Sequence, residues 1–426
     1  MPPCNEDAIE FAPTGGELKN LSTTKGRVAI IGGSMAGLFA AVTLRSLGWQ
    51  ADIYERAGEA LANRGAGIAT HDELYAAVRG AGIDLRDEMG VRSKGRIMFD
   101  RDGHTLGSYE LPQIMTSWGL IYRFLRAQVD DARYHNGHTL CGIEPHAEGV
   151  TAVFENGARI EADWLLGADG TRSSVRSIVA PAALAEYCGY FGWRGLIDEA
   201  LVAPDILAQF DQRMSFCMAP GGHWLGYLVA GPNDALTPGQ RWYNWGWYRT
   251  ATEAVLRDHL TDAGGHYHEN GIPHDRIRGE LIEAMRGEAR AWLAPQVQAV
   301  IAATARPFLQ GMYDFCTPRF LFDRVALLGD AAATARPHCG MGVSKAAVDA
   351  ASFAHALDAG GAALEAWQDA RVAYAREIVE WSRDLGSYIG PPSEDPVRRA
   401  KAQHHMRPAV LLGATAASDY REFMYR

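Results

Sequence analysis

The stretch Val28-Ala29-Ile30-Ile31-Gly32-Gly33-Ser34-Met35-Ala36-Gly37-Leu38 decides how this chain is organised. Its four aliphatic residues predict a buried parallel strand, and the small residues after them predict a tight turn into a helix that Gly48 can end. A second strand is expected at 51–54 and is followed by Glu55. Strand, glycine turn, helix, strand and acid together are typical of a βαβ unit that binds a dinucleotide.

The glycine turn and the acid suit a nucleotide chemically. Glycines let the backbone approach a pyrophosphate, and the free N–H groups at a helix start favour its negative charge. A carboxylate eighteen positions after Gly37 is near the spacing at which it binds ribose hydroxyls. Ser34 stands where the fingerprint has its middle glycine, and its side chain crowds the phosphate path slightly. The alternative is an ordinary strand-turn-helix unit with no ligand.

Composition limits the classes of protein that fit. With 426 residues, 47% hydrophobic and 22% charged, the chain can form two or three globular cores. A formal net charge of −10 without a basic run argues against nucleic acid as the main partner, and no apolar run is long enough to span a membrane. Six scattered cysteines and an N-terminus unlike a signal peptide predict reduced thiols, no metal site and a cytoplasmic location.

Two arginines in the first third are candidate phosphate ligands. Arg64 begins a second glycine patch, where the backbone can come close to a flat ligand; the alternative is a flexible loop. Arg123 lies in a helix expected at 120–126, where an arginine exposed to solvent is the commoner case. Between them, Asp102-Gly103 predicts a hairpin turn that takes the chain briefly into a second sheet.

Residues 187–311 are rich in tryptophan and tyrosine, many of them at strand-like alternation. We expect an antiparallel sheet with an aromatic face here, followed by helices over about 275–304. Such a face is most often core, but beside a cofactor domain it is also a lining for a flat organic substrate. The candidate lining residues are Tyr190, Trp193 and Trp247.

Two later strands also end in an acid. Asp169-Gly170 follows the first and Asp330 follows the second, and α/β proteins bind ligands at the carboxyl ends of such strands. Helices are expected at 344–357 and 363–385. After Pro391-Pro392 the chain is interpreted as a polar tail without identifiable chemistry.

The chain resembles the single-component FAD-dependent aromatic hydroxylases, of the para-hydroxybenzoate hydroxylase type, over about residues 26–385. Three motifs carry this likeness in order: Gly32 to Gly37 with Glu55, Gly167-Ala168-Asp169-Gly170, and Gly329-Asp330 with Pro337. Trp193-Arg194-Gly195 and Arg336-Pro337-His338 add a likeness to hydroxylases of pyridine rings. Two positions depart from the family: Ala333, where a histidine is frequent, and Met341, where the family often has the glutamine of Gly-Gln-Gly.

This resemblance implies an α/β fold with a discontinuous Rossmann-like FAD-binding domain, a substrate domain built on an antiparallel sheet plus helices, and C-terminal helices. The expected FAD-binding domain comprises 26–92, 121–186 and 312–390, and the expected substrate domain comprises 93–120 and 187–311. Residues 1–25 would be a flexible lead-in and residues 391–426 a tail. A homodimer is possible by the same likeness.

The resemblance also implies roles in holding FAD. Glu55 would bind the adenosine ribose, Arg123 would reach the pyrophosphate, and Asp330 would bind the ribityl chain. The backbone of 340–343 would cradle the pyrimidine edge of the flavin, where a helix N-terminus stabilises the negative charge of the reduced ring. The full expected cofactor set is Gly32, Gly33, Ser34, Met35, Ala36, Gly37, Glu55, Arg56, Arg64, Arg123, Asp169, Asp330, Pro337, Gly340, Met341, Gly342 and Val343.

The implied chemistry is aromatic hydroxylation. NAD(P)H would reduce FAD, O₂ would add at flavin C4a, and the resulting hydroperoxide would hydroxylate an electron-rich aromatic or hydroxypyridine-like ring. The reaction is faster when a ring hydroxyl is deprotonated, so His338, which the likeness places at the reactive edge, is a candidate base. His223 and Tyr227 are rival bases, and a purely structural role of His338 in its loop is the alternative.

Three other functions stay open from the sequence. A flavin oxidoreductase on the same fold would not insert oxygen. A flavin-dependent halogenase is suggested faintly by Trp245-Gly246-Trp247, but Tyr248-Arg249 follow where that family has Ile-Pro. A nucleotide-binding scaffold or sensor without catalysis is the third.

Overall fold

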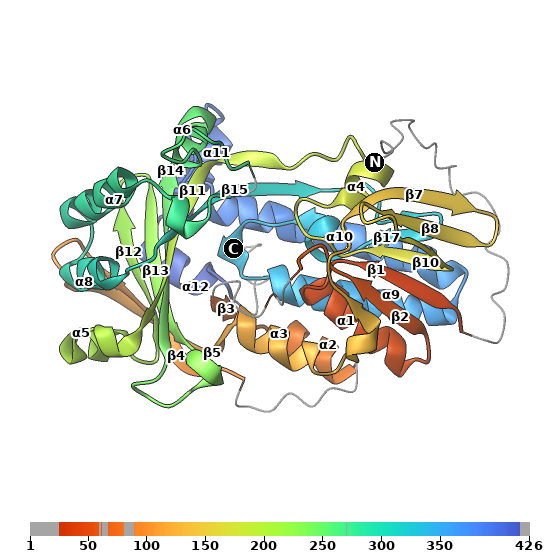
Figure 1. Ribbon diagram of the computed structural model, residues 1–426. Coiled ribbons are helices and arrows are strands. Elements are labelled where there is room, and N and C mark those ends of the chain that lie inside the picture. The colour runs from red at the N-terminus through yellow and green to blue at the C-terminus, as the bar shows by residue number, and fades with distance from the viewer. Residues whose placement is uncertain (1–24, 59–60, 62–66, 81–88, 270, 418–426) are drawn as a thin grey trace.

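The computed structural model describes residues 25–58, 61, 67–80, 89–269 and 271–417. Two large sheets organise them: a mainly parallel sheet on one side of the molecule, and a nine-stranded sheet on the other (Figure 1). The predicted α/β fold, with one parallel and one antiparallel sheet, is confirmed. The predicted lead-in falls outside the described residues except for Lys25. None of the described helices combines the length and apolar character that crossing a bilayer requires.

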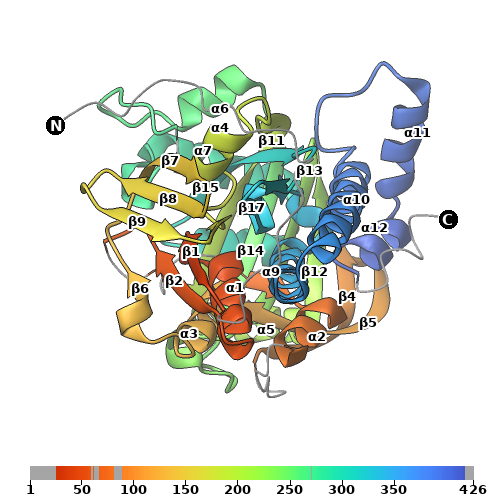
Figure 2. The same cartoon turned by 90° about the vertical axis from the view of Figure 1, so that its right-hand side faces the viewer.

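The parallel sheet has the strand order β16-β17-β10-β1-β2-β6, in which only β16 runs antiparallel to its neighbour. Its strands are β16 (Leu321–Phe322), β17 (Val325–Leu327), β10 (Trp164–Gly167), β1 (Arg27–Ile31), β2 (Gln50–Tyr54) and β6 (Tyr134–His135). One face is covered by α1 (Met35–Ser46) and α9 (Gly342–Ala359), with α10 (Ala362–Leu385) packed on α9 (Figure 2). The other face is covered by the small sheet β7 (Leu140–His146), β8 (Gly149–Phe154) and β9 (Arg159–Ala162) (Figure 2).

The register of this sheet brings the three sequence motifs to one edge. Ile31 at the end of β1 pairs with Gly167 at the end of β10 and with Tyr54 at the end of β2. Gly167 pairs in turn with Leu327 at the end of β17. The segments that follow these four strand ends therefore lie side by side, at the edge where parallel sheets bind ligands.

The nine-stranded sheet has the order β18-β15-β11-β14-β13-β12-β4-β5-β3, and only β12 and β4 run parallel. Its strands are β18 (Ala333–Thr334), β15 (Phe308–Cys316), β11 (Glu186–Asp198), β14 (Trp242–Thr250), β13 (Gly222–Val229), β12 (Arg213–Ala219), β4 (Val91–Phe99), β5 (Thr105–Ser117) and β3 (Gly67–Ala69). The hairpin predicted at Asp102-Gly103 is present, with Gly103 at positive φ in its turn, and β12 and β13 form a second hairpin with Gly221 at positive φ. Strands from the first half of the chain thus complete a sheet made mainly by its middle.

The two faces of this sheet have different neighbours. On the outer face, the helices α5 (Pro204–Phe210), α6 (Glu253–His259), α7 (Gly279–Trp292) and α8 (Pro295–Ala303) enclose an aromatic core (Figure 1). The inner face is turned toward the parallel-sheet half and carries Tyr190, Tyr227 and Tyr248. Alternation along each strand decides which face a side chain joins.

The C-terminal residues correct the prediction of a polar tail. They form α11 (Pro396–His405) and α12 (Pro408–Ala414), and α12 packs on β4 and β5. Leu411 and Leu412 are both nearly inaccessible to solvent. The polar composition of α11, which is mostly exposed, hid the short apolar segment that follows it.

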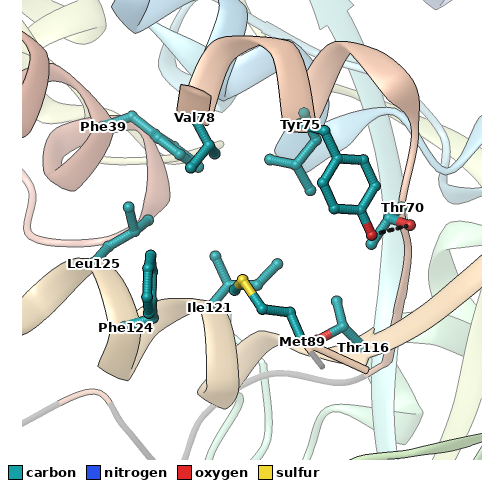
Figure 3. A pocket seen from close by; sticks show the side chains of 10 residues that line it. Phe39, Thr70, Tyr75, Val78, Met89, Thr116, Ile121, Phe124 and Leu125 are labelled. Atoms are coloured by element: carbon teal, nitrogen blue, oxygen red, sulfur yellow. Dashed lines mark hydrogen bonds between the residues drawn. The ribbon is translucent and has the colours of Figure 1, made fainter. Parts of the chain in front are cut away.

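A small apolar pocket lies where α2 (Asp72–Gly80) and α3 (Trp118–Arg126) meet α1 (Figure 3). Side chains such as Phe39, Val78 and Leu125 point into it, and the hydroxyl of Tyr75 donates to Thr70 Oγ1 at its edge (Figure 3). Its volume of about 10 Å³ is close to the smallest that holds one water molecule. This pocket is therefore a packing feature and not a ligand site.

Candidate active site and cofactor cleft

The first candidate region is a cleft at the carboxyl edge of the parallel sheet, with a volume of about 190 Å³. The ends of β1, β2 and β10 line it, and Trp118 and His138 complete it. Sequence reasoning did not find these last two residues, because no motif surrounds them. Of the expected cofactor residues, the cleft gathers Gly32, Ser34, Glu55, Arg56 and Asp169.

Glu55 is held in this cleft by its own turn. Its Oε2 accepts a hydrogen bond from the Gly33 amide at 2.8 Å, and its Oε1 accepts one from the Ala57 amide at 2.9 Å. The residue is 7% exposed. Each carboxylate oxygen keeps a further lone pair, so the position suits ribose hydroxyls as additional donors.

The starts of α1 and α9 offer backbone donors to a ligand. Neither of their N-cap residues, Ser34 and Met341, makes a side-chain capping hydrogen bond. In contrast, Ser173 Oγ caps α4 (Ser174–Val179) by accepting from the Arg176 amide. A Cβ built at Gly342 would meet no atom within 4 Å, so open space faces the start of α9. These two helix starts fit a pyrophosphate and an electron-rich ring edge.

The two strand-end acids differ in how they are used. Asp169 accepts from Ser173 Oγ at 2.5 Å and from the Ser174 amide at 2.7 Å, so its carboxylate braces the loop that carries it. The carboxylate of Asp330 accepts no hydrogen bond from any described residue, whereas its backbone carbonyl accepts from Thr334 Oγ1. Burial raises the pKa of both carboxyls. Asp330 is thus the acid that a ligand hydroxyl can reach without displacing a protein donor.

A buried charge network, missed from the sequence, supports the Asp330 loop. Lys345 donates to the Gly329 carbonyl at 2.7 Å and to Asp349 at 3.2 Å. Asp349 accepts from the Gly329 amide at 3.0 Å and pairs with Arg371 at 2.6 Å. Lys345 and Asp349 are fully buried. Their i, i+4 spacing on α9 was the available signal, but such pairs are common on exposed helix faces.

The two arginines expected to bind phosphate, Arg123 and Arg64, have different outcomes. Arg123 does not line the cleft, because its guanidinium pairs with Asp234 in the loop before β14, with Nε 3.1 Å from Oδ2. Arg123 joins α3 to the other half of the molecule, and its expected contact with the pyrophosphate stays a prediction. Arg64 lies outside the described residues.

The second candidate region lies between the inner face of the nine-stranded sheet and the turn at Pro337–Cys339. His338 is 2% exposed, and its Nε2 lies 2.7 Å from the hydroxyl of Tyr190. His223 is 1% exposed, and its Nδ1 lies 2.7 Å from the hydroxyl of Tyr388. The two imidazole centroids are 5.7 Å apart. We call these four residues the histidine cluster.

The second nitrogen of each imidazole has no protein partner. His338 Nδ1 and His223 Nε2 are buried and accept or donate no hydrogen bond within the described part of the chain. Burial lowers the pKa of His223 to about 3 and, with help from the nearby His223 and Arg336, lowers the pKa of His338 well below its usual value. Both rings are therefore neutral near pH 7, and each presents one unused polar atom.

Three further residues lie against the histidine cluster. The ring of Tyr248 lies edge-on to His338 with centroids 4.7 Å apart, and Arg194 Nη2 donates to the Tyr248 hydroxyl at 3.3 Å. Gly386 lies behind His338, where a Cβ would come within 2.8 Å of His338 Nε2. Alternation with Trp247 could have pointed to Tyr248; Tyr388 follows a helix and carries no such signal.

The expected substrate residues divide between the two faces. Tyr190 belongs to the histidine cluster through its bond to His338. The expectation that Trp193 and Trp247 line the substrate site is wrong, because both side chains are buried in the core between the sheet and the outer helices. Tyr227 is on the inner face beside Gly67, and burial raises the pKa of its phenol. Tyr227 thus lies next to β3, whereas the imidazoles of His223 and His338 lie beside each other.

Comparison with known proteins decides the family. The chain is 31% identical over 335 residues to 2,6-dihydroxypyridine 3-monooxygenase of Paenarthrobacter nicotinovorans, which covers 78% of this chain and 83% of that protein. The chain belongs to the FAD-dependent aromatic hydroxylases. It is also 26% identical to 6-hydroxynicotinate 3-monooxygenase of Pseudomonas fluorescens, over 79% of this chain and 83% of that enzyme.

Structural comparison agrees with the family. The solved structure of 2,6-dihydroxypyridine-3-hydroxylase from Arthrobacter nicotinovorans matches with a TM-score of 0.81 at 27% identity, over 88% of this chain and 96% of that one. A family model described as "FAD binding domain-like" matches residues 187–314, which include much of the nine-stranded sheet. As a member of this family the protein is an FAD-dependent aromatic monooxygenase, and its relatives support oxygen insertion over the alternative without it. The uncapped helix starts and the unused Asp330 carboxylate fit FAD.

Proposed function

We propose that this hydroxylase acts on a neutral or weakly acidic hydroxylated N-heteroaromatic ring, of the hydroxypyridine type, bound against the histidine cluster. The observation that carries the proposal is the pair of neutral imidazoles 5.7 Å apart, each with one unused buried nitrogen. A heteroaromatic ring with polar atoms at two positions offers a hydrogen-bond partner to each of the two nitrogens. Relatives that act on 2,6-dihydroxypyridine and 6-hydroxynicotinate support this class.

The distribution of charge favours this class over simple carboxylated rings. Arg241 is neutralised by Glu199 at 2.8 Å, Arg213 lies 3.4 Å from Glu110, and Arg336 is bound by Asp314 at 2.7 Å. Among the described residues, Arg194 is the cation that remains near the histidine cluster, where it donates to Tyr248. One partly engaged arginine suits the partial negative charge of an acidic ring hydroxyl better than a full carboxylate.

His338 is the proposed base. With its proton on Nε2 and donated to the Tyr190 oxygen, His338 has a free lone pair on Nδ1 that can accept the proton of a ring hydroxyl. Because burial lowers the pKa of His338, it is a weak base and works best on a hydroxyl that is itself acidic. Bound FAD, once reduced by a nicotinamide, supplies the activated oxygen. His223, fixed by Tyr388, would orient the far side of the ring.

The cofactor roles that we propose follow from the cleft, the two helix starts and the Asp330 loop. Glu55 holds the ribose hydroxyls, the start of α1 faces the pyrophosphate, Asp330 binds the ribityl chain, and residues 340–343 cradle the flavin. Glu55→Ala should weaken FAD binding by about 1–3 kcal/mol, since it leaves ribose hydroxyls and two turn amides unpaired. Fluorescence titration of the apoprotein measures this, with the exposed Glu144→Ala as control. Unchanged affinity would make Glu55 only a brace of the Gly33 turn.

The finer features of the family are also proposals for this chain. The reductant would be NADH or NADPH. The chain would form a homodimer. It would work in the cytoplasm, where thiols stay reduced. The described cysteines, which form no disulfide, suit such a compartment.

A substrate screen tests the proposed function. The FAD-loaded enzyme is mixed with NADH or NADPH and a panel of hydroxypyridines, phenols and benzoates, and nicotinamide oxidation is followed with peroxide counted separately. We expect hydroxypyridines to stimulate oxidation with little peroxide release. Stimulation by benzoates alone would contradict the substrate class, and no stimulation by any ring would favour a nucleotide-binding role without catalysis.

A further inference from the structure

Ala416, just beyond α12, has an unusual backbone conformation. Its φ is +49°, in the left-handed region that a residue with a Cβ adopts at a cost, and it is 5% exposed. Such a conformation persists only where the surroundings hold it, and it is found most often at functional sites. The position therefore calls for an account of what holds it and what it touches.

Buried side chains from the other end of the sequence hold the Ala416 peptide. Its carbonyl accepts from Gln113 Nε2 at 2.9 Å and from Arg96 Nη2 at 3.2 Å. Arg96 Nη1 also donates to the Leu412 carbonyl at 2.7 Å, and Arg96 Nη2 donates to Gln113 Oε1 at 3.1 Å. Arg96 is fully buried, and within the described ranges it has no acidic partner. Its guanidinium donates instead to the carbonyl groups of the C-terminal segment.

The same peptide touches the turn that carries His338. The Ala416 amide donates to the His338 carbonyl at 2.8 Å. Its side chain lies against Gly340, where an added Cβ would come within 2.7 Å of the Ala416 Cβ. Gly340 has a φ of +67° and ends the 3-10 turn immediately before α9. Ala416 thus contacts both the proposed base and the turn that leads into the proposed flavin cradle.

We propose that Arg96 and Gln113 are positioning residues of the hydroxylase: through the Ala416 peptide they fix the turn from His338 to Gly342. This inference rests on the proposed function for the role of His338, but the positioning itself is a property of the fold. A loss of either side chain leaves the Ala416 carbonyl short of a donor in a buried place. The turn then loses its fixed partner, and the imidazole and the start of α9 move relative to the ring.

The competing account is that Arg96 and Gln113 only anchor α12 to the sheet. Both accounts predict a lower melting temperature for Arg96→Met and Gln113→Leu. Only the positioning account predicts a change at residues 338–342, which neither side chain contacts directly.

The experiment measures hydrogen exchange, FAD affinity and coupling in full-length Gln113→Leu and Arg96→Met. We expect exchange of the amides at 338–342 to rise about tenfold or more, FAD to bind several-fold more weakly, and a larger share of consumed nicotinamide to yield peroxide. Arg96→Lys, which keeps a donor, should restore part of the coupling. Lys94→Met, an exposed change on the same strand, should leave all three unchanged.

Further outcomes separate the accounts. Faster exchange confined to α12, with 338–342, FAD affinity and coupling all unchanged, would overturn the proposal. Should Arg96→Met not fold, Gln113→Leu decides the question, with Ala416→Gly as its match: glycine keeps both backbone bonds and should keep the protection of 338–342. Exchange and FAD affinity need no substrate, so they remain decisive even where the proposed substrate class fails.

Discussion

The two faces of the nine-stranded sheet are both aromatic and both buried, yet they differ in the polar atoms that they leave unpaired. The outer face packs Trp193, Trp224, Trp245 and Trp247 against helices, and its unpaired polar atoms include the indole nitrogens of Trp224 and Trp247, which can only donate. The inner face places His223 opposite His338, and each imidazole keeps a nitrogen that can donate or accept. Aromatic content alone therefore does not locate a ring-binding site. Our proposal locates it instead by the two neighbouring imidazoles that each keep an unused nitrogen.

Removing the imidazole of the proposed base should have the largest effect on the inner face. We expect His338→Ala to keep FAD but to lower the coupled hydroxylation rate by about 10²–10⁴-fold, most severely below the pKa of the substrate's own hydroxyl. Steady-state rates across pH, with product and peroxide measured together, test this. His104→Ala, in the exposed β4–β5 turn, is the control. A normal product yield with an unchanged pH profile would move the search for the base to Tyr227.

The outer face should respond in stability and not in chemistry. Trp247 is fully buried and stacks edge-on against Trp292, so Trp247→Ala should lower the free energy of unfolding by about 3–5 kcal/mol. At a temperature where the variant is folded, the ratio kcat/KM should stay within a few-fold of the wild type. Chemical denaturation and initial rates on the same sample test this. A large loss of kcat/KM in the folded variant would return Trp247 to the substrate site.

Acid should lower the free energy of unfolding through the buried histidines. Burial lowers the pKa of His223 to about 3 and of His71, beside Ser344, to about 4, whereas unfolded histidine titrates near 6.5. Below pH 6.5 the unfolded chain binds more protons, so stability is full above that pH and falls as pH drops toward the folded values. His223 alone accounts for roughly 3 kcal/mol by pH 4. Denaturation between pH 7 and 4 measures the total.

Raised carboxyl pKa values work in the opposite direction. Asp169 and Asp330 keep protons to a higher pH in the folded state, which adds stability as pH falls through their titration. Replacing His223 by glutamine separates the two effects, because it removes the titration and keeps a polar side chain. A pH profile of stability that is the same in wild type and His223→Gln would contradict the neutral, buried imidazole.

The smallest effect is expected at Tyr248, which neighbours Trp247 in sequence and lies on the opposite face. Tyr248→Phe removes the acceptor of Arg194 but keeps the ring against His338. We expect kcat/KM to fall about three- to tenfold, with a change in unfolding free energy below about 1 kcal/mol. The comparison with Trp247→Ala is the sharpest test of the two faces. A variant that loses stability instead of activity would make Tyr248 a core residue like its neighbour.

The cofactor cleft could be predicted from the sequence because its residues follow strand ends. Glycine, acid and strand signals lie within short segments, and parallel register then brings Gly32, Glu55 and Asp169 together. The histidine cluster could be predicted only in part, since Tyr388 and His223 come from segments 165 residues apart. Nothing local shows that Trp247 faces helices while Tyr248 faces the cofactor half. The contact between Ala416 and the turn at His338 could not be predicted for the same reason. The polar composition of α11 also made the segment after it resemble a tail.

Incorporation of labelled oxygen tests the central claim most directly. The enzyme is loaded with FAD and turned over under ¹⁸O₂ with a nicotinamide and the best hydroxypyridine of the screen, and the product is analysed by mass spectrometry. The account predicts one ¹⁸O atom in each product molecule, and loss of this product with matching peroxide release in His338→Ala. Product that carries oxygen only from water, or a substrate oxidised without added oxygen, would contradict it.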